Sequence, residues 1–159
     1  MSDDASVARH ERAQAIPLHA LLGLDYERPE KGARHAQVRM PVRPEAFGFT
    51  GSLHGGAIAT MVDLACALAA ARATDFDPEI ESLVTADMHV RYLGRPTTDS
   101  VIAKAEVVRI GSQLIVIECK VVDGDDHLVA SADFSMMRVP LRVPLAGGDA
   151  NIRPGEPEL

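Results

Sequence analysis

The 159-residue sequence has few aromatic residues and few cysteines. It contains no tryptophan, two tyrosines and four phenylalanines, so the core must be built mainly from aliphatic side chains and methionine. Cys66 and Cys119 lie in apolar segments and form no Cys-x-x-Cys pair, which argues against a zinc knuckle, a redox motif and a disulfide-rich secreted domain. A chain of this length buries enough surface to fold without such crosslinks.

The sequence also lacks an excess of positive charge and a long uninterrupted apolar run. Lys and Arg number 16 against 23 Asp and Glu, and the net charge of −7 argues against a nucleic-acid-binding surface. Residues 1–15 are polar and charged, unlike a signal peptide. The longest apolar run, 55–71, carries an aspartate, and we expect it to be too short and too polar to span a membrane. The composition predicts a soluble, cytoplasmic protein.

Hydropathy patterns predict one α+β domain at 16–139, preceded by a flexible segment 1–15 and followed by a flexible tail 140–159. The expected helices are 16–22 and 57–74, and the expected strands are 33–42, 83–93, 100–110, 113–122 and 127–139. Strands and helices do not alternate, and no Gly-x-Gly-x-x-Gly follows a strand, so a dinucleotide-binding α/β fold is excluded.

The predicted helix 57–74 is apolar on every face and carries one acidic residue, Asp63. Such a helix should be buried all round, most simply under the strands. A buried carboxylate is costly, and Asp has a low helix propensity. Asp63 is therefore either a solvated structural residue near a helix end or a functional carboxylate, and its apolar neighbours favour function.

Just before this helix lies the segment Gly51-Ser52-Leu53-His54-Gly55-Gly56. Glycines at a helix start leave backbone N–H groups accessible to a carbonyl or an oxyanion. The same two glycines would also suit a simple loop-to-helix turn, and His54 would suit a packed loop position.

The segment from Leu53 to Asp63 resembles the His-Gly-Gly-(x6)-Asp signature of hotdog-fold acyl-CoA thioesterases of the phenylacetic-acid-degradation (PaaI-like) type. The stretch from Thr85 to Pro96 resembles the third-strand motif of that family, and the similarity runs from about Leu22 to Val139. The resemblance implies a long central helix wrapped by a curved antiparallel sheet. It also implies homodimers that pair into homotetramers, with active sites at the dimer interface.

The resemblance implies a hydrolase for acyl-CoA, with no metal and no cofactor beyond the coenzyme A of the substrate. Asp63 would be the nucleophile or the general base for water. The backbone N–H of Gly55, with that of Gly56 as a second donor, would polarise the thioester carbonyl. His54 would line the site, and Thr85 would hold the attacking water from the partner subunit.

One position departs from the family pattern. Many relatives carry Asn six residues before the His, where this chain has Gly48. Thr50, Ser52 or a water would have to replace the amide, or activity would be lower. Phe47 and Phe49 beside it would suit either an acyl pocket or a loop anchor.

Three arginines and one turn are candidates for binding the phosphates and the pantetheine or nucleotide of coenzyme A. Guanidinium groups bind phosphate bidentately, which nominates Arg91, Arg95 and Arg109, although each is also an ordinary surface residue. Backbone donors at Gly111-Ser112 would complete the site.

The strand 83–93 predicts one polar face, because Thr85, Asp87, His89 and Arg91 alternate at period two. That face would border the cleft or be solvated. The spacing of His54, Asp63 and His89 matches no zinc-binding pattern. The sequence also contains no Gly-x-Ser-x-Gly motif, which argues against a serine hydrolase.

Two alternatives to a thioesterase follow from these residues. A non-catalytic acyl-CoA-binding or regulatory hotdog protein is favoured by Gly48. A hotdog hydratase would need an Asp/His pair in a different motif.

Overall fold

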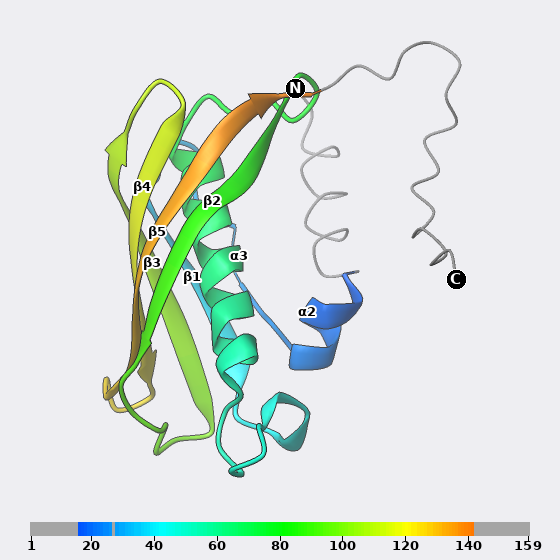
Figure 1. Ribbon diagram of the computed structural model, residues 1–159, viewed down its shortest axis with the longest axis vertical. Coiled ribbons are helices and arrows are strands. Elements are labelled where there is room, and N and C mark those ends of the chain that lie inside the picture. The colour runs from blue at the N-terminus through cyan, green and yellow to red at the C-terminus, as the bar shows by residue number, and fades with distance from the viewer. Residues whose placement is uncertain (1–15, 27, 142–159) are drawn as a thin grey trace, which may run out of the picture.

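The computed structural model describes residues 16–26 and 28–141, and it shows a five-stranded antiparallel sheet curled around one long helix (Figure 1). This arrangement is the hotdog fold expected from the sequence. The predicted terminal segment 1–15, and the predicted tail 140–159 beyond residue 141, lie outside the described residues.

The observed elements follow the predicted order, and their ends lie within two residues of the predicted ends. They are α2 (Pro17–Leu22), β1 (His35–Pro41), the 3-10 turn η1 (Pro44–Ala46), α3 (Gly55–Ala73), β2 (Glu81–Tyr92), β3 (Ser100–Ile110), β4 (Leu114–Asp123) and β5 (Leu128–Pro140). The helix α2 begins with a proline at its first turn, as predicted.

The strand order in the sheet is β1-β3-β4-β5-β2, and every neighbouring pair is antiparallel. The hairpins β3–β4 and β4–β5 place three successive strands side by side. The strand β2 pairs with β5 and forms one edge of the sheet. It runs past α3 in the opposite direction, so the start of α3 lies near the end of β2 (Figure 1).

The helix α3 is buried on the side that faces the sheet, but it has one open side. Fully buried residues such as Met61, Val62 and Cys66 pack against the concave face of the sheet. Thr60, Asp63 and Ala67, which are spaced three and four residues apart, are only partly buried. The expectation of a helix buried all round is therefore wrong, because a single curled sheet covers only part of the helix circumference.

The helix α3 has 19 residues and is long and apolar enough, by length and composition, to cross a membrane. The expectation that this segment is too short and too polar therefore does not hold for the observed helix. Half of its most apolar stretch is nevertheless buried inside the fold, as in the core helix of a soluble protein.

A buried carboxylate, Asp123, joins the loop after β2 to the turn after β4. Its Oδ2 accepts hydrogen bonds from the backbone N–H and the hydroxyl of Thr97, both at 2.8 Å. Its Oδ1 accepts from the N–H groups of Asp125 (3.1 Å) and His127 (3.0 Å). The hydrogen bond from the Thr97 N–H, followed by the other donors, lowers the pKa of Asp123 from 3.8 to about 2.

We expect Asp123→Ala to destabilise the protein at neutral pH, and we expect this loss to vanish in acid. Because the pKa is lower in the folded chain, the contribution of Asp123 is complete above about pH 4 and is lost as the pH falls towards 2. Thermal unfolding of wild type and Asp123→Ala, followed across that pH range, measures the effect. A difference between their melting temperatures that stayed constant down to pH 2 would contradict it.

Candidate active site

The helix α3 starts at His54, which caps it with its own side chain. The backbone of His54 is extended, and its Nδ1 accepts a 2.9 Å hydrogen bond from the Gly56 N–H. The accepting Nδ1 carries no proton, so a neutral His54 has its proton on Nε2. The Gly56 N–H thus already has a partner, which does not fit its expected role as a second donor to substrate. The capping by His54 explains why α3 begins two residues earlier than predicted, and the expected role of His54 in lining the site stays a prediction.

The backbone N–H of Gly55 differs from that of Gly56. Gly55 is the first residue of α3 and is only partly buried, and within the described residues its N–H makes no hydrogen bond. The N–H groups of a first helical turn point out along the helix axis and carry its positive dipole end. This amide is available to a carbonyl oxygen that approaches the helix from beyond its N-terminus.

Asp63 lies on the open side of α3 and is held by a residue from β2. The Thr85 hydroxyl donates a 2.7 Å hydrogen bond to Asp63 Oδ1, and the carboxylate is only partly buried. Both residues belong to one chain. Thr85 thus contacts Asp63 of its own chain, and its expected role, holding the attacking water from the partner subunit, stays a prediction.

A β-bulge in β2 decides which side chains face the helix. The register against β5 shifts between Thr85 and Asp87, so Ala86 has no direct partner there. Thr85 pairs with the buried Met136 and faces α3, whereas Asp87 pairs with Ser135 and faces outward. The predicted single polar face is therefore wrong, because the extra residue reverses the alternation after Thr85.

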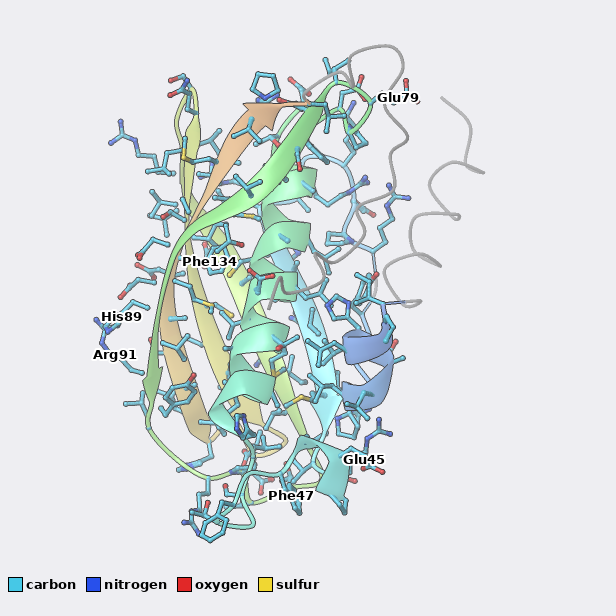
Figure 2. All side chains as sticks on the ribbon, turned by 45° about the vertical axis from the view of Figure 1, so that its right-hand side comes forward. Glu45, Phe47, Glu79, His89, Arg91 and Phe134 are labelled. Atoms are coloured by element: carbon cyan, nitrogen blue, oxygen red, sulfur yellow. The ribbon has the colours of Figure 1, made fainter. Side chains whose placement is uncertain are left out.

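The bulge also places His89 and Arg91 on the outer side of the sheet, away from α3 (Figure 2). There the Arg91 Nη1 donates a 2.7 Å hydrogen bond to Asp133 Oδ2, and His89 Nδ1 lies 3.7 Å from the same oxygen. This hydrogen bond from Arg91 lowers the pKa of Asp133. All three side chains are exposed, and Arg91 does not meet Asp63 within its own chain.

The other residues nominated for coenzyme A lie at the two ends of the molecule. Arg95 is exposed on the loop after β2, at the end where α3 begins. Arg109, Gly111 and Ser112 belong to the β3–β4 hairpin at the opposite end (Figure 1). The Gly111 N–H is already used in that hairpin, where it donates to Leu114 O at 2.8 Å. Within one chain, the loop with Arg95 therefore lies at the end where α3 starts, whereas the β3–β4 hairpin lies at the opposite end.

Gly48 lies beside His54 in the loop that leads into α3. Its N–H donates to Ser52 O at 2.7 Å, and a Cβ at this position would lie 3.4 Å from His54 Cδ2, an ordinary contact distance. A side chain at position 48 would therefore stand next to the helix cap. Phe47, close to the start of α3 in Figure 2, is partly exposed, and Phe49 is fully exposed.

Tyr92, at the end of β2, also lies near the site, although it is not among the site residues predicted from the sequence. Its hydroxyl donates a 3.1 Å hydrogen bond to Gly55 O. The sequence signal that could have indicated Tyr92 is its place in the motif 85–96. With the bulge, this position faces α3.

No three His, Cys, Asp or Glu side chains within 16–26 and 28–141 come together as a metal site, and the absence of a metal stays a prediction.

Comparisons with known proteins show the family of this chain. Residues 50–130 match the model of the thioesterase superfamily. A candidate esterase of Halobacterium salinarum is 33% identical over 128 residues, which are 79% of this chain and 82% of that protein. The matched family segment contains the helix start, Asp63 and Thr85.

Solved structures share the fold. A mutant thioesterase of Pseudomonas aeruginosa superposes with a TM-score of 0.74 at 22% identity, covering 84% of this chain and 94% of that one. The PaaI protein of the E. coli phenylacetic acid degradation operon gives 0.69 at 22% identity, with coverages of 82% and 90%. A Bacillus halodurans protein crystallised with CoA gives 0.68 at 27% identity, with coverages of 86% and 84%. The chain therefore belongs to the thioesterase superfamily and is a thioester hydrolase of the hotdog type.

Proposed function

We propose that the protein hydrolyses acyl-CoA to a free carboxylic acid and CoA, with Asp63 and the Gly55 N–H as its reactive groups. The observation that carries this proposal is a carboxylate on a helix that is apolar except for Thr60 and Arg72, held by the Thr85 hydroxyl at 2.7 Å. The free amide at the start of the same helix supports it. The CoA bound to the Bacillus halodurans relative supports the choice of thioester.

The two reactive groups of one chain are too far apart to act on the same thioester. Gly55 and Asp63 are separated by eight residues of α3, which is about 12 Å along the helix axis. A carbonyl bound to the Gly55 N–H lies beyond the helix start, further from Asp63 still. A reacting atom must lie about 3 Å from both the donor and the nucleophile or its water.

We therefore propose that each site combines two copies of the chain. Asp63 and Thr85 come from one copy, and Gly55 of the partner subunit supplies the oxyanion donor. A two-fold dimer makes two identical sites of this kind. Such a dimer would form on the open side of α3 around Asp63 and on the edge of β2 that has no partner strand among residues 16–26 and 28–141. Pairing of two dimers would give the expected homotetramer.

The chemistry proceeds by addition and elimination at the thioester carbon. The Asp63 carboxylate accepts a proton from an attacking water, or attacks the carbon itself, and both routes need its negative charge. The carbonyl oxygen becomes an oxyanion that accepts the hydrogen bond from the partner's Gly55 N–H. The carbon–sulfur bond then breaks, and the CoA sulfur leaves and takes up the proton that Asp63 accepted from water. If Asp63 attacks the carbon itself, the acyl group stays on its carboxylate as a mixed anhydride, and water then hydrolyses this anhydride to release the acid and restore the carboxylate. Of the three nominated arginines, Arg95 belongs to the loop after β2, at the end where α3 begins, and we propose that it binds a CoA phosphate.

Release of free thiol from a panel of acyl-CoA substrates tests the proposed function. We expect turnover of at least one class among short-chain, medium-chain and aryl acyl groups. Tight binding of acyl-CoA in calorimetry, without release of thiol from any member of the panel, would overturn the proposal and favour the non-catalytic alternative.

A further inference from the structure

The oxyanion donor proposed above lies at a point where a helix is intrinsically loose. Gly55 and Gly56 open α3, and glycine restricts the backbone less than any other residue. The first turn of a helix also frays more readily than its middle. A donor that stabilises a transition state must be held in place before the reaction. Something outside the helix backbone therefore has to restrain Gly55.

Tyr92 makes two contacts that supply this restraint. Its hydroxyl donates to Gly55 O at 3.1 Å. Its ring covers the Cα of Gly55 so closely that a Cβ there would lie 3.2 Å from Tyr92 Cζ and 3.4 Å from Cε1. The ring thus occupies the space beside Gly55, and about half of its surface remains exposed at the helix start.

The strand that carries Tyr92 also carries Thr85. Both side chains lie on the inner face of β2, since the bulge at Ala86 turns Thr85 and Tyr92 to the same side. One contacts Asp63 in the middle of α3, and the other contacts Gly55 at its start. A single edge strand therefore sets the positions of both reactive groups of the helix.

We infer that Tyr92 is a positioning residue for thioester hydrolysis, which fixes the Gly55 N–H through its ring and its hydroxyl. This inference rests on the proposed function. Tyr92 would act on the transition state, because the oxyanion forms only there. Removing its contacts with Gly55 should therefore lower kcat while KM stays nearly constant. Close packing of the Tyr92 ring is then a second reason, besides the free N–H, why position 55 is a glycine.

The test compares Tyr92→Phe, Tyr92→Ala and the neighbouring control Leu93→Ala, which truncates a similarly exposed side chain directly after the end of β2. We expect Tyr92→Ala to lower kcat by about tenfold or more and Tyr92→Phe by about threefold, each with KM within about twofold of wild type. Leu93→Ala should keep the wild-type kcat. Partial rescue by phenylalanine separates the ring from the hydroxyl.

Hydrogen exchange separates failure of this inference from failure of the proposed function. The Ala57 and Ile58 amides, which donate to His54 O, should exchange faster in Tyr92→Ala than in Leu93→Ala, whether or not acyl-CoA is the substrate. If wild type releases no thiol but exchange is faster, the proposed function fails and the positioning of the helix start stands. Wild-type kcat and unchanged exchange in Tyr92→Ala would overturn the inference.

Discussion

Asp63→Asn is expected to lower kcat for acyl-CoA hydrolysis by about three orders of magnitude or more. Asparagine has nearly the same shape as aspartate, but it neither accepts a proton at neutral pH nor attacks a thioester. The fold should survive, because the amide oxygen can still accept the hydrogen bond that Thr85 donates. Thiol release and the midpoint of urea unfolding measure both effects on one preparation.

Thr85→Val and Thr85→Ser serve as the matched pair for this experiment. Valine removes the hydroxyl at nearly constant shape, whereas serine keeps it. We expect valine to lower kcat by about tenfold and serine to stay close to wild type, because the hydroxyl orients the carboxylate. Equal rates for wild type and Asp63→Asn would remove Asp63 from the reaction.

Gly55→Pro is expected to lower kcat by about two orders of magnitude relative to Gly55→Ala. Proline at the first helical position removes the N–H and is otherwise favoured there, and the extended backbone of His54 suits a following proline. Alanine keeps the N–H and introduces the same Cβ against Tyr92, so it controls for that crowding. The ratio of the two rates isolates the hydrogen-bond donor. Equal kcat values for the two variants would show that this N–H takes no part.

Much of the fold was predictable because its signals are local. The run that forms α3 is apolar at every position except Thr60, Asp63 and Arg72, and Gly55-Gly56 marks its start. The later strands are separated by clear turn residues, so the ends of β3 were predicted to the residue. The alternation of polar and apolar residues in β2 does not reveal the extra residue at Ala86. This bulge depends on how β2 pairs with β5, which lies far along the chain. The face assigned to Asp87, His89 and Arg91 was wrong for that reason.

The site was predictable only in part for a similar reason. The motifs predict Asp63, Gly55 and Thr85 as site residues, and the contact between Thr85 and Asp63 brings two of them together. The capping of Gly56 by His54 and the contact of Tyr92 with Gly55 arise from side-chain directions that a sequence motif does not state. The prediction for the arginines rests on guanidinium chemistry alone, which does not indicate that they lie at different ends and faces of the molecule.

The central claim is that each site joins Asp63 of one chain to Gly55 of the partner subunit, and mixing two inactive variants tests it most directly. Asp63→Asn and Gly55→Pro are unfolded together, or co-expressed, and reassembled in equal amounts. Half of the dimers are then hybrids with one intact site of two, which predicts recovery of about a quarter of the wild-type activity. If both groups of a site belonged to one chain, every site in the mixture would carry one defect. Activity that stayed at the level of the separate variants would contradict the account.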